Sequence, residues 1–131
     1  MRRLSLIVPM VAIILVMSAC GGSSGLSEAE FAYNYGLEAS SQGLITEAIS
    51  HYDKAIQLDP DNAVYYRNRG VANNKLGQYE NAITDYTMAI QLDPGYALAY
   101  YNRGVILGIL GKDDLAKENF NKACELDSSR C

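Results

Sequence analysis

The sequence repeats itself every 34 residues, and this period constrains the fold more than any other feature. The segment 63–96 sets the frame, and the segments 29–62 and 97–130 follow the same pattern. Three columns of the aligned repeats hold only glycine, only alanine or only a bulky ring: Gly36, Gly70, Gly104; Ala48, Ala82, Ala116; Tyr52, Tyr86, Phe120. Such self-similarity is typical of a solenoid, in which each unit buries its apolar face only against its neighbours.

Composition excludes several classes of function. The chain has 131 residues, of which 49% are apolar, and this suits one small domain with an appendage. Three cysteines, one histidine and no tryptophan leave little for a metal site or a nucleophile-base pair, so we expect no enzyme activity, metal or cofactor. Fifteen acidic residues outnumber eleven basic ones, which argues against nucleic acid as a partner.

The segment 1–19 has the layout of an export signal. Arg2 and Arg3 precede an apolar run over 4–17, and small residues follow it. The run is shorter than the roughly 20 apolar residues of a spanning helix, so a cleaved signal is favoured over a membrane anchor. The segment 20–26 is rich in glycine and serine, which predicts a flexible tether.

Met17-Ser18-Ala19-Cys20 resembles the lipobox of bacterial lipoproteins. The resemblance implies that the chain is cut before Cys20 and carries lipid there. It further implies a place in the bacterial cell envelope, at the outer membrane facing the periplasm if the cell is Gram-negative. The alternative is an ordinary signal peptide cut near Ala19. That alternative is less favoured, because it leaves a reactive free thiol at the new N-terminus.

Local signals predict two helices in each repeat. Ser27 and Glu30 have the spacing of a capping box, so the first helix should begin there, run to about Ser41 and end on Gly43. A second helix is expected over 46–58, where Asp59-Pro60 stops it. The same pattern recurs in the next two repeats, so we expect an all-α domain over 27–131 with six helices of about 21 Å each.

These columns resemble the tetratricopeptide repeat, which has small residues at positions 8, 20 and 27, an aromatic residue at 24 and proline at 32. The resemblance implies a right-handed solenoid of three repeats of antiparallel helices, over 29–62, 63–96 and 97–130. We expect the glycine column to let the alanine column approach closely.

In this family the first helix of every repeat lines a concave surface that binds protein or peptide partners. Carried over by position, the expected groove residues are Tyr33, Asn34, Leu37, Arg67, Asn68, Val71, Asn74, Tyr101, Asn102 and Val105. The recurring asparagine suits either hydrogen bonding to a peptide backbone or a scaffold role, and both remain open. The clamp for heat-shock chaperone carboxylates needs lysine and asparagine where this chain has Tyr33 and Leu37, so that activity is not expected.

The end of repeat three suggests a second surface. Ile106 and Ile109 lie one turn apart on a helix with no following repeat, so we expect them to form an apolar patch. Two functions follow from these features. The leading one is a membrane-anchored scaffold that binds a protein or peptide; the alternative is an envelope lipoprotein that forms a homodimer through this patch.

Cys124 and Cys131 are expected to form a disulfide in an oxidising envelope. A continuous helix would hold their backbones about 10 Å apart, beyond the reach of the bond. The helix must therefore end near Asp127 and the tail must fold back.

Overall fold

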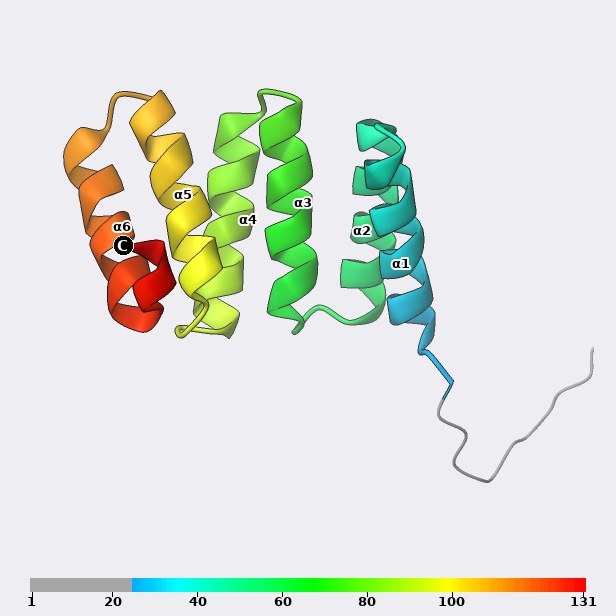
Figure 1. Cartoon of the computed structure of the whole chain (residues 1–131). Coiled ribbons are helices and arrows are strands. Elements are labelled where there is room, and N and C mark those ends of the chain that lie inside the picture. The colour runs from blue at the N-terminus through cyan, green and yellow to red at the C-terminus, as the bar shows by residue number, and fades with distance from the viewer. Residues whose placement is uncertain (1–24) are drawn as a thin grey trace, which may run out of the picture.

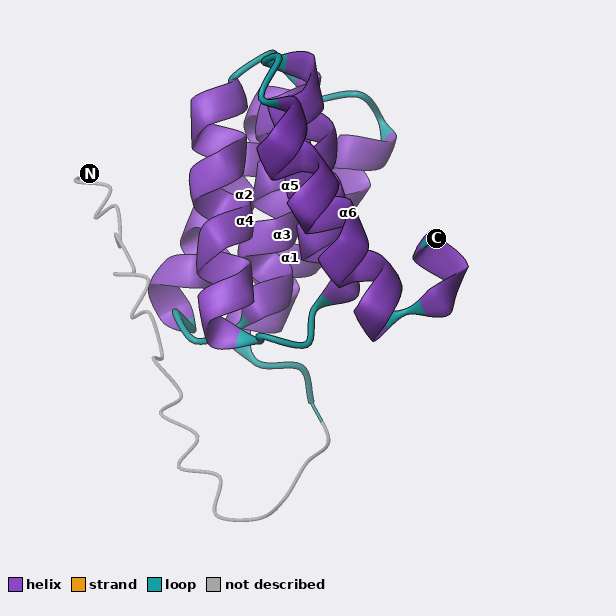
Figure 2. Cartoon of the chain, turned by 90° about the vertical axis from the view of Figure 1, so that its left-hand side faces the viewer, coloured by secondary structure: helices purple, strands orange, loops and turns teal. Residues whose placement is uncertain are grey.

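The computed structural model describes residues 25–131 as a stack of helical hairpins (Figure 1). The helices are α1 (Glu28–Ser41), α2 (Ile45–Leu58), α3 (Ala63–Lys75), α4 (Tyr79–Leu92), α5 (Ala97–Ile109) and α6 (Asp113–Leu126), followed by the 3-10 turn η1 (Ser128–Arg130). Each odd-numbered helix packs most closely on the helix after it, and α2 and α4 pack on the next hairpin. Figure 2 shows the stack end-on, with α5 and α6 nearest. The expected all-helical solenoid of three repeats is confirmed.

Helix ends follow the chemistry of their terminal residues. The backbone N–H of Glu30 donates to Ser27 Oγ at 3.2 Å, and Glu30 Oε2 accepts from the N–H of Ser27 at 2.7 Å, which completes the expected capping box. Gly43, Gly77 and Gly111 follow the first helix of each repeat at φ of 79°, 72° and 71°. Glycine takes this left-handed conformation without the strain of a side chain, so the chain can turn sharply into the second helix.

The glycine column lies closest to the aromatic column, and at Gly104 the expected approach to the alanine column is also present, because an added Cβ would lie 3.3 Å from the carbonyl oxygen of Ala116. A Cβ added to Gly70 would lie 2.7 Å from Cε1 of Tyr86, and one added to Gly104 would lie 2.8 Å from Cε1 of Phe120. The absence of a side chain thus makes room for the ring of the second helix. Alanine on the second helix is nevertheless fully buried, as Ala82 shows.

Ile106 does not belong to an exposed patch, so the predicted surface of Ile106 and Ile109 is wrong. Ile106 is 0% exposed and packs with Ala82 and Tyr86 of the preceding repeat, whereas Ile109 is 53% exposed. The column to which Ile106 belongs faces the repeat before it, not the repeat after it. Its member in repeat one is Glu38, which is exposed because no repeat precedes α1 among residues 25–131. The homodimer argument, which needed both isoleucines on the surface, therefore fails.

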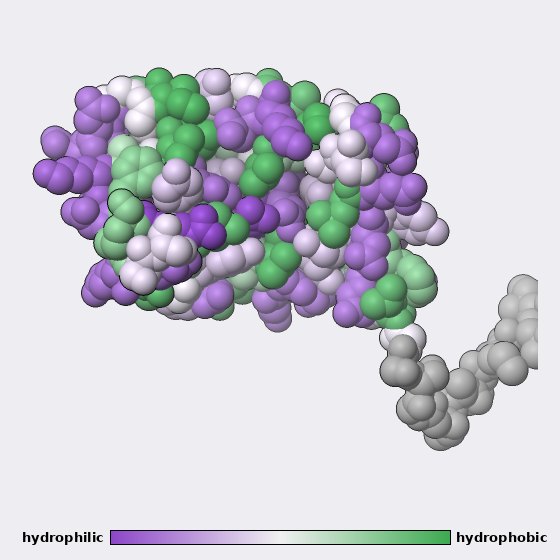
Figure 3. Space-filling model, viewed as in Figure 1, coloured by the Kyte–Doolittle hydropathy of each residue, from purple (hydrophilic) through white to green (hydrophobic). Residues whose placement is uncertain are grey.

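Large exposed apolar side chains gather instead at the opposite end of the stack. Phe31 and Tyr35 on α1 are half-exposed. The members of their columns in repeat two, Tyr65 and Arg69, pack against the preceding hairpin. Figure 3 shows an apolar patch beside the start of α1.

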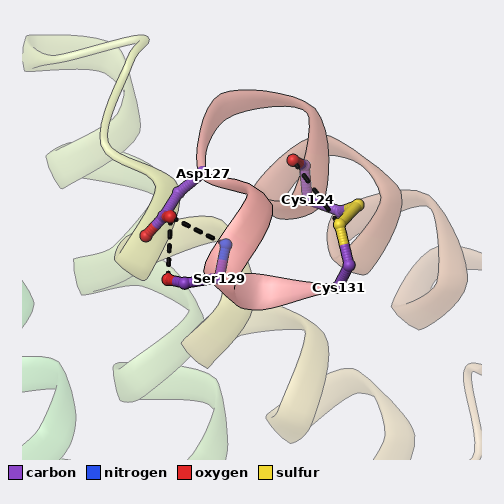
Figure 4. The surroundings of a disulfide bond; sticks show 4 residues. All are labelled: Cys124, Asp127, Ser129 and Cys131. Carbon is purple, nitrogen blue, oxygen red and sulfur yellow. Dashed lines mark hydrogen bonds between the residues drawn. A yellow bond between two sulfur atoms is a disulfide. The ribbon is translucent and has the colours of Figure 1, made fainter.

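The C-terminal tail folds back on the stack after Leu126. The carboxylate of Asp127 accepts hydrogen bonds from the N–H of Ser129 at 3.0 Å and from its hydroxyl at 2.8 Å (Figure 4). This turn brings the Cα atoms of Cys124 and Cys131 to 4.7 Å, and a disulfide joins the two residues. The helix thus ends where such a bond requires it to end.

The expected export signal, Cys20 and most of the tether lie outside the described residues. Within 25–131, no helix combines the length and apolar character needed to cross a membrane.

Candidate functional site

We call the side of the stack formed by α1, α3 and α5 the groove face, because the groove residues predicted from the sequence lie on these helices. In Figure 1 these helices lie in front of α2 and α4. Figure 3 shows apolar and polar side chains interspersed over the same view, not one continuous apolar surface. The face therefore offers hydrogen bonding together with apolar contact.

A hollow of about 230 Å³ lies between α3 and α5, and we call it the central hollow. It brings five of the predicted groove residues together and adds one ring from α4; its lining is Arg67, Val71, Asn74, Asn102, Val105 and Tyr86. Arginine and two amides supply the polar groups, and two valines supply apolar contact. This combination suits a peptide, whose backbone needs hydrogen bonds and whose side chains need shallow apolar sites.

Arg67 is the only side chain among residues 25–131 with a buried polar atom that lacks a hydrogen-bond partner. That atom is Nε, while Nη1 donates to Asn68 Oδ1 at 2.8 Å. An unpaired buried donor is costly, so a ligand oxygen that reached it would be bound favourably. Arg67 is therefore a candidate recognition group on the groove face.

Tyrosines surround this arginine. Burial raises the pKa of Tyr86 to about 12, and the nearby charge of Arg67 only partly opposes the rise. Burial likewise raises the pKa of Tyr33, Tyr52 and Tyr96, with Arg67 again opposing. All four phenols thus remain protonated near neutral pH, and the charge of Arg67 is not neutralised by a phenolate.

Asn68 is already engaged within the protein. Its Nδ2 donates to the hydroxyl of Tyr33 at 2.8 Å and to the carbonyl oxygen of Val64 at 3.1 Å, and its Oδ1 accepts from Arg67. Of the two roles left open for the asparagine column, Asn68 therefore takes the scaffold role. The side chain of Asn102, in the same column, makes no hydrogen bond within the described residues, so its amide is available to a ligand.

A second hollow of about 230 Å³ lies between α1 and α3, and Tyr33 is part of its lining. Two predicted groove residues line it together with five that the prediction missed: Tyr33, Asn34, Leu26, Glu30, Asn62, Val64 and Tyr65. A signal for two of the missed residues was present, because Glu30 and Val64 occupy the second position of their repeats, which also faces ligands in this family. Tyr86 was missed because the aromatic column was assigned to the core.

Three predicted residues line neither hollow: Asn68, described above, Leu37 and Tyr101. Leu37 is exposed on α1. The ring of Tyr101 lies 5.5 Å from that of Phe120, and the guanidinium carbon of Arg130 in the tail lies 5.8 Å from the Tyr101 ring centre. Tyr101 is thus covered in part by the C-terminal tail, at one end of the groove face.

Comparison with known families identifies the repeats. The model of the TPR repeat matches residues 36–77 and 72–111, and that of the tetratricopeptide repeat matches residues 97–130. The chain belongs to the tetratricopeptide repeat (TPR) family. A search by sequence finds no similar chain among curated proteins.

Solved TPR structures resemble this TPR chain in both sequence and fold. The second TPR of Spaghetti (RPAP3), bound to the HSP90 peptide SRMEEVD, is 34% identical over 77% of this chain and 94% of that chain, with a TM-score of 0.75. The Arabidopsis OM64 TPR domain is 30% identical over 77% and 84%, with a TM-score of 0.76. MamA is 30% identical over 77% and 59%, with a TM-score of 0.74. One of these relatives is therefore a TPR domain with a peptide bound.

Proposed function

We propose that this protein is a lipid-anchored scaffold of the bacterial cell envelope that binds an extended peptide segment of a partner on its groove face. The observation that carries the peptide-binding part is the central hollow, whose lining joins Arg67, with its buried and unpartnered Nε, to two amides and two valines. It is supported by the unengaged amide of Asn102 in the same lining and by a similar TPR domain that binds a peptide. The membrane part rests on the lipobox-like sequence that ends at Cys20.

The chaperone peptide of the relative is not carried over to this chain. At two positions where that recognition needs lysine and asparagine, this chain has Tyr33 and Leu37. Tyr33 is moreover committed to its hydrogen bond with Asn68. We infer that Arg67 recognises a backbone carbonyl or a single carboxylate of a different sequence.

Arg67→Ala should weaken partner binding by roughly 1 to 4 kcal/mol, because arginine in a desolvated hollow is typical of the residues that dominate interfaces. The partner is first captured from envelope extract with the purified full-length protein, and its affinity is then measured by titration calorimetry. Arg67→Lys keeps the charge but loses the planar fork, so it should restore only part of the affinity.

Lys54→Ala is the matched control, because Lys54 is an exposed cation on α2 that lines neither hollow. It should bind like the unchanged protein. Equal binding by Arg67→Ala and Lys54→Ala would place recognition elsewhere and defeat the groove assignment. Circular dichroism of each variant checks that the helices persist.

Cys20→Ser should move the protein from the membrane fraction to the soluble fraction, because two or more acyl chains anchor stably and each buried methylene adds about 0.8 kcal/mol. Mass spectrometry of the unchanged protein should find Cys20 as the acylated N-terminal residue. A mature protein that begins elsewhere, or that salt alone washes from membranes, would show that the anchor does not exist.

A further inference from the structure

An arginine occupies the seventh position of repeats two and three, and in repeat two it is held by two carboxylates. Nε of Arg69 lies 3.1 Å and 3.2 Å from the carboxylate oxygens of Asp85, and Nη2 lies 2.7 Å from one of them. Nη1 donates to Asp53 of the preceding repeat at 2.7 Å. Burial disfavours the charge, but these hydrogen bonds outweigh it and raise the pKa of Arg69.

Repeat three keeps the arginine and lacks both carboxylates. In the 34-residue register, Asn119 stands where Asp85 stands, and Thr87 stands where Asp53 stands. Nε of Arg103 donates to Asn119 Oδ1 at 2.8 Å, and Nη1 donates to the hydroxyl of Thr87 at 3.1 Å. Around the guanidinium of Arg103, the neutral oxygens of Asn119 and Thr87 thus replace the two carboxylates that surround the guanidinium of Arg69.

Arg103 is therefore a half-buried cation that has no ion pair within residues 25–131. Its second η nitrogen makes no hydrogen bond in that part of the chain. Burial lowers the pKa of Arg103, with Tyr100 and Glu118 opposing. Because arginine stays protonated, this desolvation is an unfavourable term that a bound anion would relieve.

Space for such an anion lies beside Arg103. A pocket of about 430 Å³ opens between α5 and α6, larger than the hollow of about 280 Å³ beside Arg69. The ring centre of Tyr100 lies 5.7 Å from the guanidinium carbon and forms one wall. Lys122 and Glu125 pair with each other in the lining at 2.9 Å.

The charge of the pocket also permits an anion. The opposite charges of Lys122 and Glu125 cancel in their ion pair. The charged groups that remain in the lining are Arg103 and Glu118. The cluster at Arg69 already accommodates two carboxylates around one guanidinium. One added carboxylate in the pocket, together with Glu118, would give Arg103 the same ratio of two carboxylates to one guanidinium.

We propose that this pocket is a second binding site, which takes a carboxylate of a peptide ligand at Nη2 of Arg103, the guanidinium nitrogen that Asn119 and Thr87 leave without a hydrogen bond. A guanidinium fork and a carboxylate match in a planar, charge-assisted pair. The pocket shares no lining residue with the central hollow, so the proposal does not depend on the groove.

The test follows the Nε–Hε signals of arginine in proton-nitrogen NMR spectra of the purified full-length protein. The probe is Gly-Glu-Gly with acetylated and amidated ends, and the control is Gly-Gln-Gly blocked in the same way. The glutamate peptide should shift the Arg103 signal in a saturable manner and leave the Arg69 signal in place. Blocked Gly-Gln-Gly should shift neither, whereas Gly-Gln-Gly with a free C-terminus tests whether a terminal carboxylate also binds.

Thr87→Asp and Asn119→Asp each supply the missing carboxylate within the chain. Either variant should weaken the glutamate peptide by about tenfold or more, because the added aspartate competes for the guanidinium. Two variants are used because Asn119 also donates to the carbonyl of Leu115 at 2.8 Å, and its loss could disturb α6. An unmoved Arg103 signal, an equal response to the glutamate and glutamine peptides, or full binding by a folded Thr87→Asp variant would overturn the proposal.

Discussion

Asp85→Ala should lower the free energy of unfolding by about 3 kcal/mol, because it removes the buried carboxylate from the Arg69 ion pair and leaves that charge with only the exposed Asp53 as a partner. The side chain of Asp85 is 3% exposed, and that of Arg69 is 25% exposed. Asp85 also accepts from Nδ2 of the buried Asn73 at 2.9 Å, so the substitution leaves three donor nitrogens without this acceptor: Nε and Nη2 of Arg69 and Nδ2 of Asn73. Urea denaturation followed by circular dichroism measures the loss.

Asp53→Ala is the matched control, because Asp53 pairs with the same arginine at the same 2.7 Å distance. Its side chain is 55% exposed, so its removal should cost less than about 1 kcal/mol. Equal losses for Asp53→Ala and Asp85→Ala would mean that burial does not set the strength of these pairs.

Ile106→Ala should likewise cost about 3 kcal/mol, because it removes three methyl or methylene groups from a fully buried side chain and leaves a cavity against α4. The loss appears as a lower thermal midpoint, by roughly 15 °C for a domain of this size. Differential scanning calorimetry of the purified full-length protein measures it.

Ile109→Ala makes the same chemical change three residues further along α5, at a side chain that is 53% exposed. It should change the stability by no more than about 0.5 kcal/mol. Similar effects of the two alanine variants would contradict the orientation of α5 against α4. A loss of self-association in Ile109→Ala alone would reopen the question of an interface at this end.

The sequence predicted the helices well because their signals are local. The capping box at Ser27, the glycine that follows each first helix and the period of 34 residues each specify a boundary without help from distant residues. Helical periodicity also groups residues on a common face. It does not show whether that face packs against the preceding or the following repeat. For this reason Ile106 was expected on the outward side of repeat three, whereas it packs against repeat two.

The candidate site was predicted only as a set of positions. The family's repeat register assigned Arg67, Asn74 and Asn102 to the groove, and in the structure all three line the central hollow. The repeat register could not show that the side-chain amide of Asn68 hydrogen-bonds to Tyr33 and Val64, since the contact with Tyr33 depends on how α1 and α3 approach each other. For the same reason the different surroundings of Arg69 and Arg103 emerge only from the packed structure.

The folded-back tail makes the two ends of the stack different: the last hairpin is partly covered, whereas the first hairpin exposes aromatic rings. A disulfide joins Cys131, the residue after η1, to Cys124 of α6, and the guanidinium of Arg130 lies over the ring of Tyr101. A further hairpin appended after Leu126 would therefore first have to displace the tail. At the other end, Phe31 and Tyr35 present ring surface of the kind that a preceding hairpin covers in later repeats. Designed repeats could therefore be added before Ser27, where the ring surface is exposed. Repeats added after Leu126 would be obstructed by the tail, which thus limits the stack to three repeats at that end.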